Sequence, residues 1–69
     1  MTNINLLKSK MVAAGDDAPT NKLAKLLGVS RITAGHKLNG KSKFNQREIK
    51  IISDHYNLSP EEVAEIFLN

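Results

Sequence analysis

Residues 20–40 read TNKLAKLLGVSRITAGHKLNG, and this stretch decides the fold. Its leucine-rich first half has helical spacing and ends at Gly28, which can take the positive φ of a tight turn at little cost. Ser30 can cap the helix that follows. The small side chains of Ala24 and Ala34 would let the two helices cross closely. The sequence therefore predicts a helix-turn-helix, two short helices joined by a three-residue turn.

A further helix is expected before this motif. It covers about residues 4–14, with Thr2 or Asn3 as its cap and Gly15 at its end. Its apolar stripe is formed by Ile4, Leu7, Met11 and Ala14.

Two more helices follow the motif, and each begins with the sequence of a capping box. Asn45 and Glu48 take the cap and third helical positions of the first, and Ser59 and Glu62 take those of the second. With connections of only a few residues, five short helices make one compact domain. The prediction is a single all-α domain over residues 1–69 with a central helix-turn-helix.

The net charge of +3 is unevenly distributed along the chain. Residues 1–19 are neutral overall. Residues 20–50 carry eight lysine and arginine side chains against Glu48 alone, a net charge of +7. Residues 51–69 carry four acidic side chains and no lysine or arginine, a net charge of −4. A central basic block indicates a polyanionic partner, with a merely solvated basic surface as the alternative.

Composition and motifs argue against several other classes of protein. No apolar run approaches the ~20 residues that span a bilayer, and the N-terminal stretch lacks the apolar region of a signal peptide. We therefore expect the protein to be located inside the cell. The chain has no cysteine, and His36 and His55 lie far apart without a metal-binding motif. No nucleophile motif surrounds any serine. We therefore expect no enzymatic activity, no metal and no cofactor.

The motif and its surroundings resemble the Cro and lambda-repressor (XRE-type) family of helix-turn-helix regulators. The resemblance rests on Ala24 followed by Gly28-Val29-Ser30, on Leu38-Asn39-Gly40, on FNQREI at 44–49 and on NLSPEE at 57–62. It covers nearly the whole chain and is nearest to short regulators of phages and prophages of Gram-positive bacteria. It implies the five-helix lambda-repressor-like fold and sequence-specific DNA binding, in the cytoplasm of a bacterial host and associated with the nucleoid.

The resemblance also implies which residues read DNA. In that family the second helix of the motif, here residues 31–39, lies in the major groove with its N-terminal residues on base edges. Arg31 is the main candidate because arginine makes two bonds to guanine. Ile32 either contacts a thymine methyl or is partly buried against the neighbouring helix, and His36 either reaches DNA or is simply exposed. The base-contact residues carried over by position are Ser30, Arg31, Ile32, Gly35 and His36.

Three positions in the motif depart from the family pattern. Thr20 stands where the family often has a phosphate-supporting glutamine. Lys37 occupies an often apolar position, and we expect its stem to cover the core while its ammonium faces out. Gly35 costs about 1 kcal/mol relative to alanine inside a helix, and it either permits close approach to DNA or weakens the reading helix. The phosphate contacts implied by the resemblance are Thr20, Thr33, Lys37, Asn39, Lys41 and Lys43.

The oligomeric state and a competing function complete the expectations. Operators are usually inverted repeats read by a two-fold dimer, so a homodimer at least on DNA is expected. The apolar end formed by Ile66, Phe67 and Leu68 is the candidate interface, unless Phe67 packs on the core of its own chain. The competing hypothesis is a protein-interaction module that binds and modulates a phage repressor, with little DNA binding of its own.

Overall fold

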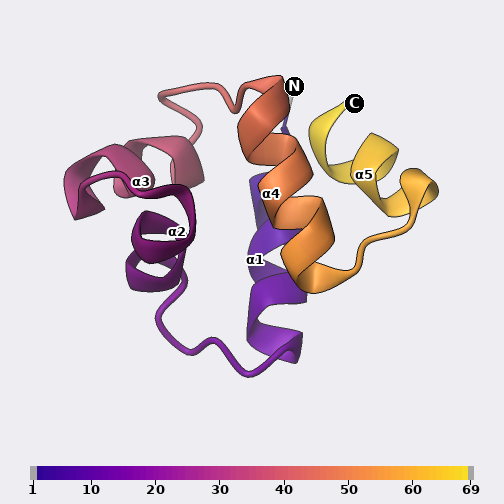
Figure 1. Ribbon diagram of the computed structural model, residues 1–69, viewed down its shortest axis with the longest axis horizontal. Helices are drawn as coiled ribbons and strands as arrows, with labels where there is room; N and C mark the ends of the chain where they lie inside the picture. Colours follow the sequence, from indigo (N-terminus) through magenta and orange to yellow (C-terminus); the bar gives the residue numbers. More distant parts are fainter. Residues whose placement is uncertain (1, 69) are drawn as a thin grey trace.

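The fold is described by a computed structural model over residues 2–68, which contains five helices and no strand in that range. The helices are α1 (Ile4–Ala13), α2 (Pro19–Leu27), α3 (Arg31–Leu38), α4 (Gln46–Tyr56) and α5 (Pro60–Phe67). In Figure 1, α2 and α3 lie together on one side of the molecule, α4 lies in the middle with α1 behind it, and α5 lies on the other side. The predicted all-α fold is confirmed.

Local hydrogen bonds explain where the helices begin. In α4 and α5 the N–H of the capping residue also donates to the glutamate at the third helical position, which completes both predicted capping boxes. In the described chain α2 alone lacks a side-chain cap, because Ala18 precedes Pro19 at its start. The other four helices have a capping side chain that accepts a bond from the backbone N–H three residues on, namely Asn3, Ser30, Asn45 and Ser59.

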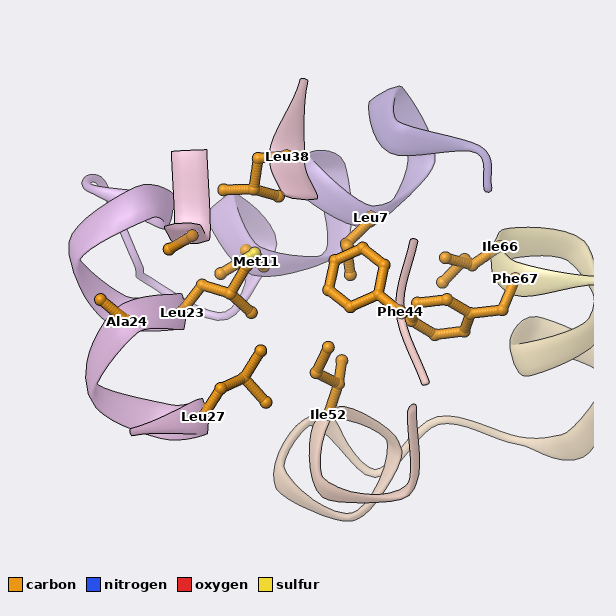
Figure 2. Close-up of a cluster of buried hydrophobic side chains, with 11 residues drawn as sticks. Leu7, Met11, Leu23, Ala24, Leu27, Leu38, Phe44, Ile52, Ile66 and Phe67 are labelled. Atoms are coloured by element: carbon orange, nitrogen blue, oxygen red, sulfur yellow. The ribbon is translucent and has the colours of Figure 1, made fainter. Parts of the chain in front are cut away.

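Every described helix contributes to one hydrophobic core, as Figure 2 shows. The loop between α3 and α4 contributes Phe44, whose ring meets that of Phe67 edge to face at 5.4 Å between centroids. Ala14 was predicted to lie on the apolar stripe of this helix, but it is exposed. The reason is that α1 ends at Ala13 and its buried face stops at Met11. The buried side chains are Leu7, Met11, Leu23, Ala24, Leu27, Ala34, Leu38, Phe44, Ile52, Ile66 and Phe67.

The apolar end of the chain packs on its own core. Ile66 is fully buried, Phe67 is almost so, and the backbone N–H of Asn3 donates to the carbonyl of Ile66 at 2.5 Å. Of the two alternatives given for Phe67, the structure shows the one in which it packs on the core of its own chain, and Ile66 packs there too, so neither side chain is available as an intersubunit surface. Leu68 remains exposed.

Two polar contacts fasten neighbouring elements outside the core. The Tyr56 hydroxyl at the end of α4 donates to Asp16 at 2.6 Å, and burial together with that carboxylate raises the pKa of the hydroxyl well above its usual range. The ammonium of Lys10 on α1 lies 2.5 Å from Glu62 on α5. This ammonium, with the backbone N–H of Ser59, lowers the pKa of Glu62 from 4.5 to about 2.

We expect the Lys10–Glu62 contact to be visible in the acid titration of the protein. Because the pKa of Glu62 is lowered in the folded chain, its contribution to stability is complete above pH 4.5 and is lost as the pH falls to about 2. In Lys10→Met the pKa of Glu62 should rise towards its ordinary value, as measured by the carboxyl carbon shift in an NMR titration. Exposed Glu61 in the same turn is the internal control. An unchanged Glu62 pKa in the variant would contradict the contact.

Candidate nucleic-acid interface

A three-residue turn joins α2 to α3, as predicted. Gly28 adopts the left-handed conformation, with φ 69° and ψ 34°, and the N–H groups of Gly28 and Val29 both donate to the carbonyl of Ala24. Ala24 and Ala34 are both buried where the two helices pack together. The turn and the small side chains thus hold α3 against α2, so that the outer face of α3 is left to solvent.

The exposed surface of α3 presents an apolar side chain between polar ones. Arg31 and His36 are exposed, and Ile32 retains 74% of its accessible surface. The expectation that Ile32 could be buried against a neighbouring helix is therefore wrong. Ile32 and His36 are four residues apart and share one face of the helix. With Arg31 one residue before Ile32, the exposed surface of α3 therefore carries a guanidinium, an apolar side chain and an imidazole.

Ser30 and Thr33, the two hydroxyl residues at the start of α3, are hydrogen-bonded to each other in the cap of this helix. The Ser30 hydroxyl accepts a bond from the Thr33 N–H at 3.1 Å and donates to the Thr33 hydroxyl oxygen at 3.0 Å. Ser30 is exposed and Thr33 half-buried. The hydroxyl hydrogen of Ser30 is therefore already donated within the cap, whereas the hydroxyl hydrogen of Thr33 can still be donated to an acceptor outside the protein.

Gly35 lies beside Thr20, on the facing side of α2. A Cβ added at Gly35 would lie 3.9 Å from the Thr20 side-chain methyl, which is an ordinary van der Waals distance. The φ of Gly35 is not positive, so its backbone does not need glycine either. Neither the backbone nor the packing of the described chain explains why this half-buried helical position carries no side chain.

The chain folds back on the end of α3 and then forms an exposed loop. The N–H groups of Lys41 and Ser42 both donate to the carbonyl of His36, at 2.9 and 3.3 Å. Asn39, Gly40 and the side chains of Lys41 and Lys43 are exposed. The structure therefore brings three of the predicted phosphate-contact residues, Asn39, Lys41 and Lys43, together directly beyond the C-terminal end of α3.

Lys37 does not lie where the sequence suggested. Its residue surface is only 8% exposed, and its ammonium donates to Glu48 Oε1 at 2.9 Å and to the carbonyl of Lys43 at 3.0 Å. The ammonium also lies 5.6 Å from the ring centre of Phe44. The expectation that this ammonium faces out to a phosphate is wrong, because a buried carboxylate and a carbonyl bind it from inside.

Glu48 has a second role that the sequence analysis missed: it binds the Lys37 ammonium. It completes the capping box of α4 as predicted, and the same oxygen that accepts from the Asn45 N–H also accepts from Lys37. The sequence predicted only this capping role for Glu48 and did not predict its burial, yet the residue is only 7% exposed. Its position as the one acidic residue among the eight cations of residues 20–50 was a signal that it neutralises one of them.

The charge asymmetry of the sequence becomes an asymmetry between two sides of the molecule. Figure 1 shows α2 and α3 on the side opposite α5. The acidic side chains Asp54, Glu61 and Glu65 are exposed on the end of α4 and on α5. The exposed cations on α2, α3, the following loop and the start of α4 are Lys25, Arg31, Lys41, Lys43 and Arg47.

Two kinds of feature are absent from the described residues. Within residues 2–68 no three histidine, aspartate or glutamate side chains come together in a way that could hold a metal ion. The longest helix there, α4, has eleven residues, and none of the described helices has the length and apolar character needed to cross a membrane.

Comparison with known proteins gives one match. The family model described as the BetR domain matches residues 3–66, from the cap of α1 to the last turn of α5. The matched region therefore includes the whole of the α2–α3 unit and the loop beyond it. No curated protein and no solved structure matches the chain.

We expect Gly35→Ala to stabilise the protein. The structure has room for the methyl group, and alanine is favoured over glycine inside a helix by about 0.5–1 kcal/mol, which should raise Tm by several degrees. Thermal and urea unfolding would measure the change. Gly28→Ala is the matched control and should destabilise, since φ at Gly28 is 69°. A less stable Gly35→Ala would show that α2 and α3 approach more closely than described.

Proposed function

The chain belongs to the BetR domain family, and we propose that it is a sequence-specific DNA-binding transcription regulator that reads an operator with α3. The observation that carries the proposal is the exposure of Arg31, Ile32 and His36 on α3, a helix that packs against α2. A face of this kind on a single helix fits the width of the major groove.

The side chains of this face suit the edges of bases. Arg31 can donate two bonds to the O6 and N7 of a guanine, and Ile32 can contact the methyl group of a thymine. The missing side chain at Gly35, one turn after Arg31 and beside Thr20, leaves the helix surface low there, which would allow the backbone of α3 to approach the floor of the groove. Specificity in this proposal comes mainly from Arg31 and Ile32.

The loop beyond α3 supplies the contacts that do not depend on sequence. Its exposed Lys41 and Lys43, with the side chain of Asn39, can bind phosphate oxygens on one strand. Thr33 and Thr20 can add hydroxyl donors from α3 and α2. Such contacts release counterions, so the affinity should fall with salt in proportion to the number of phosphates neutralised.

A dimer and a bacterial setting belong to the same proposal. Operators of helix-turn-helix regulators are usually inverted repeats, so two copies would bind half-sites about one helical turn apart. Of the residues first expected at the interface, Leu68 alone is still exposed. We place the regulator in the cytoplasm of a bacterial host, on the nucleoid or on phage DNA.

One observation favours a second function. Ile32, Leu68 and Val12 are exposed at 74, 73 and 58% of their surfaces, and isolated apolar side chains of this size can serve as anchors for a protein partner. The chain would then bind and modulate a phage repressor. Mixing it with a cognate repressor and measuring the mass of the complex with and without operator DNA separates the two functions. A stable complex that excludes DNA would favour the second.

Selection from a pool of random DNA duplexes tests the first function directly. At two salt concentrations, we expect the enriched sequences to form an inverted repeat and the affinity to fall as salt rises. Enrichment would establish the sequence preference, the dimer symmetry and the half-site spacing together. An absence of any enriched sequence at low salt would overturn the proposal.

Two substitutions should separate base contacts from phosphate contacts. Arg31→Ala should cost about 1–3 kcal/mol and relax the preference at a single base pair, because it removes a bidentate contact. Lys41→Ala should weaken binding to all duplexes alike and lower the salt slope by about one. Binding constants for a selected and an unrelated duplex measure both effects. Equal losses on both duplexes for Arg31→Ala would remove it from the base-contact set.

A further inference from the structure

The end of α3, the loop after it and the start of α4 meet at one buried ion pair. Glu48 Oε1 accepts from the Lys37 ammonium at 2.9 Å and from the Asn45 N–H at 3.0 Å, while the same ammonium donates to the Lys43 carbonyl at 3.0 Å. The side chains of Lys37 and Glu48 are each about nine-tenths buried. Three backbone segments are thereby joined by two side chains.

This ion pair fixes the backbone of the loop at its far end. The near end is already held, because the N–H groups of Lys41 and Ser42 bind the carbonyl of His36. The Lys37 ammonium holds the carbonyl of Lys43, and buried Phe44 anchors the next residue in the core. The backbone of residues 39–44 is thus attached at both ends, while the side chains of Lys41 and Lys43 point to solvent.

We propose that Lys37 and Glu48 are positioning residues for the nucleic-acid interface: they hold the loop of residues 39–43 in its phosphate-binding arrangement before DNA binds. The inference rests on the proposed function. Lys37 then contributes to DNA affinity without touching DNA, since its charge is neutralised by Glu48 and its ammonium faces inward. A loop that is already ordered does not lose conformational entropy at the moment of binding.

The direction in which one substitution changes the affinity for DNA distinguishes this positioning role from direct contact with DNA. Glu48→Gln keeps a side chain that can complete the capping box but makes the protein one charge more positive. If Lys37 contacted phosphate or acted only through net charge, affinity for DNA would rise in this variant. If Lys37 and Glu48 position the loop, affinity falls although the charge has become more favourable.

The experiment compares binding constants and salt slopes of the full chain and its variants for a selected and an unrelated duplex. We expect Glu48→Gln to bind both duplexes about three- to tenfold more weakly, with a salt slope smaller by about one. Glu61→Gln is the matched control, because it makes the same charge change at an exposed position in the first turn of α5, outside the ion pair and the loop, and it should bind as tightly as the wild type or slightly more tightly.

A double variant covers the case in which Glu48→Gln does not fold. Removing one member of a buried ion pair leaves an unpaired charge, whereas Lys37→Met with Glu48→Gln leaves none and should fold. This double variant should show the same loss on both duplexes. A folded Glu48→Gln or double variant that binds as tightly as the wild type would overturn the inference, even if its stability had changed.

Amide exchange in the free protein separates failure of the inference from failure of the proposed function. If the wild type binds no duplex under any salt condition, the proposed function fails. The attachment of the loop is then tested by exchange alone. We expect the hydrogen-bonded N–H groups of Lys41 and Ser42 to exchange faster in the double variant, because a loop released at its far end opens more often at its near end, and unchanged exchange would overturn the attachment.

Discussion

The basic side of this molecule depends on an ion pair taken out of water. Lys37 and Glu48 would each be costly to bury alone, and together they offset part of this cost because each is the other's partner and their further hydrogen bonds join the Lys43 carbonyl and the Asn45 N–H. Two apolar side chains of similar volume would often serve stability as well. What the pair adds is a single arrangement of α3, the loop and α4, because bonds have direction and apolar contacts do not.

The helix boundaries were predictable because they follow from short-range chemistry. A capping side chain, a proline in the first turn or a glycine in the left-handed conformation acts on residues no more than four positions away. The roles of Asn45, Pro60 and Gly28 could therefore be predicted from their immediate neighbours in the sequence. The α2–α3 unit was predictable for the same reason. Its turn needs Gly28, and its packing needs alanine at positions 24 and 34, all within eleven residues.

The errors arose where a side chain chooses between partners far along the chain. The apolar stripe of α5 could cover its own core or another subunit, and helical spacing is the same in both cases, so the burial of Ile66 and Phe67 came only from the structure. Lys37 was expected to extend to solvent because its carboxylate partner lies eleven residues away on another helix. The exposure of Ile32, on which the candidate site depends, likewise required the arrangement of α2 and α3 in space.

The bond from the Asn3 N–H to the Ile66 carbonyl brings the first and last turns of the domain together. Both ends of the described chain lie near the top of Figure 1, beside α4 and α5, whereas α3 lies to one side. A short peptide joining these ends would close the backbone into a ring with little entropic cost. Such a cyclic chain could be reopened in the segment between α1 and α2, giving a permuted protein that begins with α2 and ends with α1.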